Sequence, residues 1–158
     1  MKTTFQINDP SLESQWRAII LFGKNSATYK FAFAKALLSL IDKEKTKVTL
    51  EELSIPFANS VVEHLKKSDK QGSAGSSKFL GSCRSYINES LSLEELYSLT
   101  ERFGFVHVVD AFQNVNGGAI PNPFYEKNYV QGKKEIVITE NLLKKKLMNL
   151  KDQVKLNN

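Results

Sequence analysis

Hydrophobic residues recur at helical spacing in two neighbouring stretches near the start of the chain. Leu12, Trp16 and Ile19 begin one apolar stripe, and residues 31–41 carry a second. Spacings of three and four residues place such side chains on one face of an α-helix. Residues 23–26 (GKNS) lie between the stripes and combine a glycine suited to a helix C-cap with two residues suited to an N-cap. The pattern predicts two amphipathic helices joined at a sharp bend, with Trp16 as a core anchor.

Two later helix starts share one short motif. TLEE at residues 49–52 and SLEE at residues 92–95 are typical of capping boxes. In such a box, the hydroxyl of the first residue and the carboxylate of the glutamate three residues later each accept a hydrogen bond from a free backbone N–H group. Pro56 is expected to break or restart the first of these helices. Gly104 is expected to end the second.

The last third of the chain contains the only β-like patterns. Residues 105–112 are short, apolar and β-branched, which fits a buried strand or a single helical turn. Residues 124–129 and 135–139 are separated by a glycine-containing turn and predict a small hairpin, with Thr139 capping a last helix. The predicted fold is therefore mainly α, with about five to seven helices and a minor β-hairpin near the C-terminal third.

Composition fits one globular domain over residues 1–158, with a flexible polar loop at 66–78 and a frayed end at 151–158. The single cysteine, Cys83, excludes an internal disulfide and a cysteine-based zinc site. The first ten residues lack the apolar run of a signal peptide, and no window approaches about 18 consecutive apolar residues. We therefore expect a cytoplasmic protein without a membrane partner.

The net charge of +5 is distributed unevenly. Lysine and arginine outnumber acidic residues five to one over residues 64–84 and eight to three over 127–158, whereas acidic residues lead six to one over 85–126. The C-terminal excess is explained by a solvated helix end, where the dipole favours cations. The alternative for that end is an arm that contacts phosphates.

Residues 66–86 have a composition that helix packing does not require. Turn residues gather at 72–77, and Ser76 or Ser77 is suited to cap a helix that follows. Backbone N–H groups at such a start, flanked by cations, suit a phosphate, while the alternative is a solvated mobile linker. The spacing is not that of a P-loop, so nucleotide hydrolysis has no support. The candidate nucleic-acid contacts lie in this segment and at the bend between the first two helices, namely Lys24, Asn25, Ser26, Tyr29, Lys30, Lys66, Lys67, Lys70, Gln71, Ser76, Ser77, Lys78 and Arg84.

The chain shows no catalytic constellation. Its two histidines, His64 and His107, have no acid, cysteine or second histidine at ligand spacing, so we predict no metal site and no cofactor in this chain. His64 is expected at the surface or boundary, and His107 in the core or at its edge. The paired glutamates at 51–52 and 94–95 are fully explained as helix starts.

Three long phrases carry a resemblance to a known family. They are LESQWRAIILFGKNSATYKFAFAKALLSL at 12–40, LEELSIPFANSVVEHLKKSDKQGSAGSSKFLGSCR at 50–84 and GFVHVVDAFQNVNGGAIPNPFY at 104–125. This order resembles the N-terminal region of bacterial proteins that carry an HNH endonuclease domain further along the chain, over nearly all of residues 2–150. The resemblance implies a DNA-directed context in restriction or defence, with this region as the non-catalytic module.

The HNH motif has no counterpart in these 158 residues. The resemblance therefore implies either an N-terminal fragment or a stand-alone relative, with nuclease activity and its divalent metal expected only from a downstream or partner HNH domain. Two functions follow as expectations. The first is a DNA-binding module that contacts phosphates and positions a nuclease. The second is a protein interaction or oligomerisation module, for example a homodimer, that regulates a nuclease partner through an exposed apolar patch near the last helix.

Overall fold

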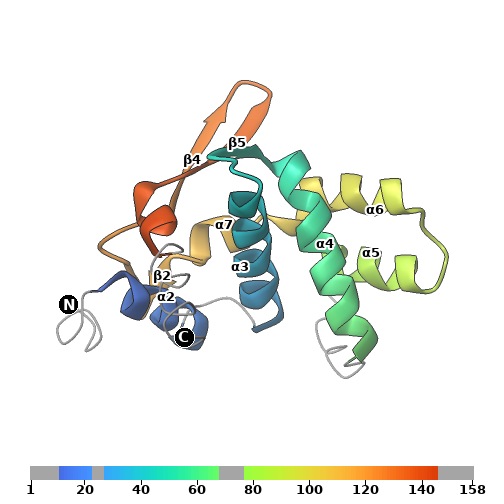
Figure 1. The fold of residues 1–158 in the computed structure, drawn as a ribbon. Helices are drawn as coiled ribbons and strands as arrows, with labels where there is room; N and C mark the ends of the chain where they lie inside the picture. The colour runs from blue at the N-terminus through green and yellow to red at the C-terminus, as the bar shows by residue number, and fades with distance from the viewer. Residues whose placement is uncertain (1–10, 23–26, 68–76, 146–158) are drawn as a thin grey trace, which may run out of the picture.

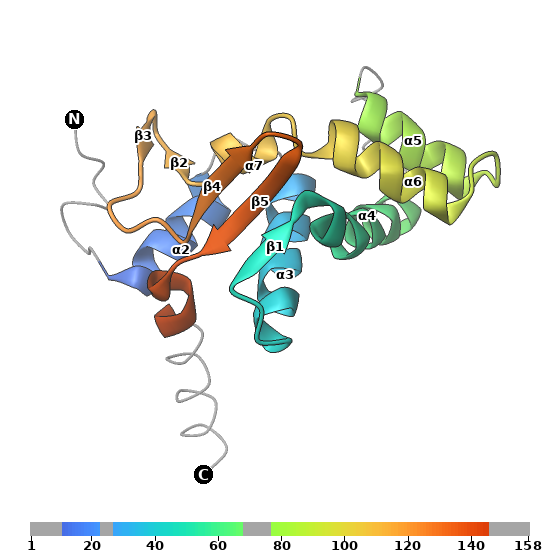
Figure 2. The same ribbon diagram turned by 90° about the horizontal axis from the view of Figure 1, so that it is seen from above.

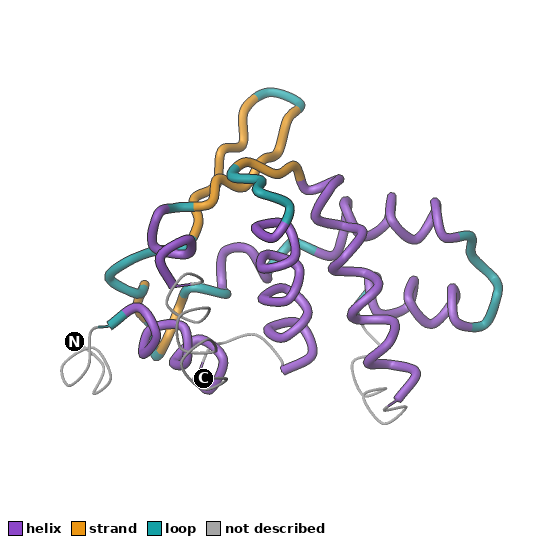
Figure 3. Tube along the Cα trace, in the orientation of Figure 1, coloured by secondary structure: helices purple, strands orange, loops and turns teal. Residues whose placement is uncertain are grey.

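Helices make up most of the chain, and a small antiparallel sheet lies at one side of them (Figure 1; Figure 3). The structure is a computed structural model that describes residues 11–22, 27–67 and 77–145. Its helices are α2 (Leu12–Phe22), α3 (Ala27–Asp42), α4 (Leu50–Lys67), α5 (Lys78–Ile87), α6 (Leu93–Leu99), the π-helix η2 (Thr100–Gly104) and α7 (Val108–Ala111). Its strands are β1 (Lys47–Thr49), β2 (Asn114–Val115), β3 (Gly118–Ala119), β4 (Tyr125–Val130) and β5 (Lys133–Ile138), and residues 140–145 are helical again. The prediction of a mainly α fold with a minor hairpin is confirmed.

Local capping chemistry sets where several helices begin. In α4 the Thr49 hydroxyl accepts a hydrogen bond from the Glu52 N–H at 3.1 Å, and the Glu52 carboxylate accepts one from the Thr49 N–H at 3.4 Å. A similar cap opens α6, where the Ser92 hydroxyl accepts from the Glu95 N–H at 3.1 Å and donates to the Glu95 carboxylate at 3.0 Å. Ser11 caps α2 by accepting from the backbone N–H three residues later. Each cap satisfies an N–H group that the first helical turn leaves without a partner.

Two helices differ from their predicted course. Pro56 was expected to break α4, but the helix runs without interruption through it. A proline removes one helical hydrogen bond and crowds the preceding turn, whereas α4 buries Leu53, Phe57 and Val61 completely on one face, and this burial outweighs the loss. The second capped helix does end at Gly104, but its last five residues are π-helical.

The three-stranded sheet joins segments distant in sequence. Its order is β1-β5-β4 with antiparallel pairs, and β4 and β5 form the predicted hairpin around a turn in which Gly132 has φ 71°. Seen from above, the sheet lies over α3 (Figure 2). The residues at 108–111 form a helical turn and not a strand. The Thr139 hydroxyl, just before the last described helical residues, donates to the Pro123 carbonyl at 2.6 Å.

An aromatic cluster forms the centre of the core. The ring of Phe33 in α3 meets Phe57 at 6.1 Å, Phe112 at 5.0 Å and Tyr125 at 5.6 Å between centroids. Trp16 is 7% exposed and packs edge-on against Phe112 and Phe124, which confirms its predicted role as a core anchor. Edge-to-face contacts of this kind stabilise a core beyond the area they bury. Among the described helices, none has both the length and the apolar character needed to cross a bilayer.

Candidate anion-binding surface

The beginnings of α3 and α5 meet through one side-chain hydrogen bond. The Tyr29 hydroxyl lies 3.2 Å from the Ser77 hydroxyl, although 48 residues separate them in sequence. Ser77 is also the N-cap of α5 and accepts from the Leu80 N–H at 3.3 Å. The Tyr29 ring packs against Phe57 and Phe79 at about the same centroid distance, 6.2 and 6.1 Å. The start of α3, which follows the predicted bend, therefore lies beside the start of α5, which follows the predicted polar loop.

The end of α4 brings cations to the same place. The last turn of α4 carries Lys66 and Lys67, both exposed, and α4 packs against α5. Lys78, the first residue of α5, is exposed and its ammonium nitrogen lies 5.1 Å from the centre of the Phe103 ring. We define the α4–α5 corner as five polar residues from these two helices and the N-cap of α5: Lys66, Lys67, Ser77, Lys78 and Arg84.

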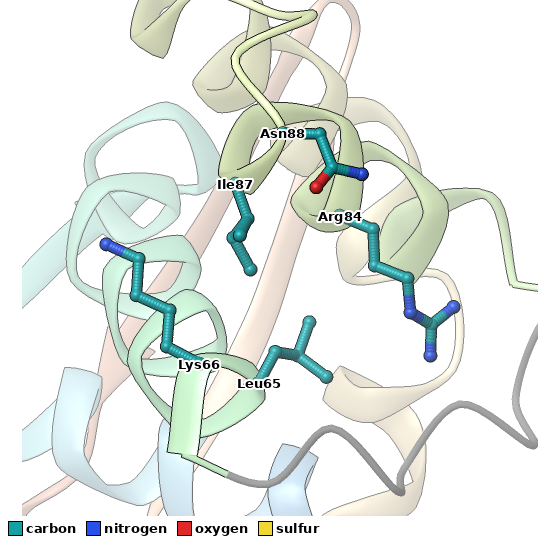
Figure 4. Close-up of a pocket in the computed structure, with 5 residues that line it drawn as sticks. All are labelled: Leu65, Lys66, Arg84, Ile87 and Asn88. Carbon is teal, nitrogen blue, oxygen red and sulfur yellow. The ribbon is translucent and has the colours of Figure 1, made fainter.

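A hollow of about 390 Å³ separates the last turns of α4 and α5, and five residues line it (Figure 4). Leu65 and Ile87 form an apolar floor, and Lys66 and Arg84 stand on either side of it, with their charged ends pointing away from one another. Asn88 lies beside Arg84. Because the two cations diverge, they suit successive anionic groups of an extended ligand better than a single phosphate.

Burial determines the ionisation of the groups behind this surface. Desolvation raises the pKa of the Tyr29 phenol, against the opposing effects of the Ser77 hydrogen bond and the Arg84 charge. Burial likewise raises the pKa of the Cys83 thiol to about 12, although Arg84 acts in the opposite direction. A thiolate is the reactive form of cysteine, so Cys83 is an inert core residue near neutral pH.

Among the described residues, neither histidine has a catalytic partner. His64 is half-buried, as its predicted boundary position requires, and its Nε2 atom is buried without a hydrogen-bond partner. His107 was expected in the core or at its edge, but it is exposed because it lies at the start of the short helix α7. Within residues 11–22, 27–67 and 77–145, no group of three histidine, cysteine or acidic side chains could hold a metal ion.

The structure brings together six of the predicted contact residues and separates one. Tyr29 contacts Ser77, which Lys78 follows at the start of α5. Lys66 and Arg84 line one hollow, and Lys67 lines another together with Thr28, the residue before Tyr29. Lys30 is only 7% exposed, because α3 is packed by neighbouring elements, and it does not belong to an accessible surface. Lys24, Asn25, Ser26, Lys70, Gln71 and Ser76 lie outside the described residues.

The predicted loop at 66–78 needs correction at its ends. Lys66 and Lys67 belong to the last turn of α4, and Lys78 begins α5. Their side chains therefore extend from helix ends. Cations at the end of α4 also interact favourably with its dipole.

Sequence reasoning missed the apolar floor and Asn88. Ile87 and Asn88, the C-cap of α5, follow Arg84 by three and four residues, a spacing that places side chains on one helical face. That periodicity was the available signal. Only the packing of α5 against α4 adds Leu65 to the same hollow.

Carboxylates do not neutralise the corner lysines in the described part of the chain. The salt bridges there join Arg17 to Glu13, Lys45 to Glu52, Lys127 to Asp110 and Lys133 to Glu135. None of these pairs includes Lys66, Lys67 or Lys78, and none includes an acidic residue of the range 89–101. Among the described residues, no carboxylate pairs with these three lysines.

Comparison with known proteins gives no relative. No protein-family model matches the chain, and no curated protein or solved structure is significantly similar to it.

Proposed function

We propose that this chain is a non-catalytic nucleic-acid-binding module whose α4–α5 corner contacts phosphates of DNA. The observation that carries the proposal is the Tyr29–Ser77 hydrogen bond, which joins α3 to the start of α5 beside the lysines of α4. Lysine and arginine contacts to phosphates supply the sequence-independent part of DNA affinity. The divergent side chains of Lys66 and Arg84 fit successive phosphates along a backbone (Figure 4).

The biological context is part of the same proposal. The resemblance to the N-terminal region of bacterial HNH endonucleases supports a role in restriction or defence, in which this module holds DNA for a separate nuclease domain. The described residues offer neither a metal cluster nor a reactive thiol for cleavage. The module would therefore position the nucleic acid, and a downstream or partner domain would cut it.

Salt dependence of duplex binding tests the proposal. Fluorescence anisotropy with a labelled 24-base-pair duplex should give a log affinity that falls linearly with log salt. Four phosphate contacts, from Lys66, Lys67, Lys78 and Arg84, predict a slope of about −3.6. The double variant Lys66→Ala/Lys67→Ala should flatten the slope by about 1.8.

A matched control separates the corner from general positive charge. Lys43 is exposed just after α3, at the opposite end of that helix from Tyr29. Lys43→Ala removes one positive charge, half the change in the double variant, and should leave the slope unchanged. Salt-insensitive binding, no binding, or an equal effect of Lys43→Ala would refute the corner as the DNA contact.

A second function, protein interaction, is favoured by one specific observation. Leu21 and Phe22 at the end of α2 are 60% and 59% exposed, and adjacent exposed apolar side chains are typical of interaction sites. Light scattering should then show a dimer that Leu21→Ser/Phe22→Ser converts to a monomer. Ile55→Ser, at another exposed apolar position, should leave the dimer intact, and a monomeric wild-type chain would remove this alternative.

A further inference from the structure

A second hollow lies between the β4–β5 hairpin and the helices η2 and α7. It measures about 230 Å³, and the hairpin contributes Lys127, Tyr129 and Lys134 to its wall. Tyr129 and Lys134 are directly paired across the two strands, and Lys127 lies two residues before Tyr129 on the same face. The described structure therefore gathers two cations and one aromatic ring at the outer part of the hairpin.

This hollow is separate from the α4–α5 corner. Leu50, the first residue of α4, lines the hairpin hollow, whereas Leu65 near the end of α4 lines the corner hollow. Fifteen residues of helix correspond to a distance of about 22 Å. A single phosphate group cannot contact both hollows, so each would take a different chemical group.

The charges of the hollow are only partly compensated. Lys127 pairs with Asp110 at 2.6 Å. Arg102 and Lys134 instead lie near aromatic rings, Arg102 at 5.1 Å from the centre of Phe103 and Lys134 at 5.8 Å from that of Tyr129. No described carboxylate forms a salt bridge with either of these two. Glu101 also lines the hollow, so three cations face two acids, and the net charge favours an anion.

The remaining lining suits a flat apolar group. Phe105 and Val109 are buried beneath the hollow, and Tyr129 is 40% exposed above it. The volume lies below the range of about 300–1,000 Å³ that is usual for drug-sized ligands. A single ring system fits that size, and a stacked base pair does not. Aromatic side chains flanked by cations are the common means of binding single-stranded nucleic acid.

We propose that the hairpin hollow holds one unstacked base of a single-stranded nucleic acid, with the base against Tyr129 and the adjoining phosphates on Arg102 and Lys134. The proposal deepens the proposed DNA-binding function and rests on it. Lys127 and Lys134 now lie over the Tyr129 ring. An incoming base would replace one ammonium group there, and that flexible side chain would turn to a phosphate.

Anisotropy with a labelled twelve-residue oligothymidylate tests this site. Tyr129→Ala should weaken binding by about 5- to 150-fold, the loss expected for one stacking ring, whereas Tyr129→Phe should bind like the wild type. Val130→Ala is the matched control, because Val130 is the next residue, is 61% exposed and lies on the opposite face of β4. Equal affinity of wild type and Tyr129→Ala, or an equal loss in Val130→Ala, would overturn the proposal.

The outcomes for the two sites can be told apart. If Lys66→Ala/Lys67→Ala flattens the salt slope of duplex binding and Tyr129→Ala changes nothing, the corner proposal stands and the hairpin proposal fails. If only single strands bind, and binding depends on Tyr129, the hairpin site stands and the corner fails. No binding to either DNA overturns both. Binding of polyglutamate as strong as that of oligothymidylate would indicate a site for acidic proteins and would also overturn the hairpin proposal.

Discussion

The hydrogen bond between Tyr29 and Ser77 can be measured by a double-mutant cycle. Tyr29→Phe removes one hydroxyl and keeps the ring packed against Phe57 and Phe79. A net contribution of about 0.5–1.5 kcal/mol is usual for such a bond. Ser77→Ala removes the same bond and also the N-cap of α5, which contributes about 1 kcal/mol more. The double variant should therefore cost no more than Ser77→Ala alone.

Unfolding in urea, followed by fluorescence, is the assay. Trp16 is the only tryptophan and is buried among aromatic rings, so its emission reports the loss of the core. The coupling energy of the cycle should be about 1 kcal/mol. For a chain of this size, a loss of 1 kcal/mol lowers Tm by about 2–4 °C.

Tyr97 provides the matched control for the cycle. Its hydroxyl donates to Asn59 at 2.9 Å on the exposed side of α6, and its hydrogen bond does not involve Ser77. Tyr97→Phe combined with Ser77→Ala should be additive to within about 0.3–0.5 kcal/mol. Additivity of Tyr29→Phe with Ser77→Ala would refute the direct contact between α3 and α5, and with it the geometry behind the α4–α5 corner.

Three further predictions concern stability. Burial raises the pKa of the Cys83 thiol from 9.0 to about 12, so above pH 9 the folded state keeps a proton that the unfolded chain loses. The free energy of unfolding should therefore fall as pH rises from 9 toward 12. Urea titrations at each pH should show a smaller fall for Cys83→Ala. Gly104→Ala would place a Cβ atom 3.1 Å from the side chain of Thr100 and should lower stability by about 1–3 kcal/mol. Gly81→Ala lies in an open part of α5 and should be neutral or stabilise the fold by up to about 1 kcal/mol. Thermal unfolding distinguishes the two variants. The Gln113 side chain accepts a hydrogen bond from the Phe124 N–H at 2.6 Å and donates one to the Tyr125 carbonyl at the start of β4. Gln113→Ala should therefore lower stability by about 1–3 kcal/mol and speed amide exchange in β4. Exchange in β4 at the wild-type rate would contradict this.

Short-range patterns in the sequence predicted the helices and the hairpin well. Thr49 with Glu52, and Ser92 with Glu95, define helix starts because both partners of each capping box lie within one turn. The role of Ser77 as a cap was predictable for the same reason. Two short segments separated by a glycine-containing turn predicted a hairpin, because strand pairing there is also local.

Contacts between distant segments decided the rest. The periodicity of α3 did not reveal that Lys30 would be buried, since that depends on which helices pack around it. Pro56 weakens a helix locally, but the tertiary burial of α4 keeps it intact. The sequence alone determined most of the helices, the β4–β5 hairpin, the capping boxes and the location of positive charge, because these depend on neighbouring residues. Only the tertiary structure paired Tyr29 with Ser77, added Leu65 to the hollow beside Arg84, and placed the hairpin lysines around Tyr129, because each of these contacts depends on how separate elements pack or pair.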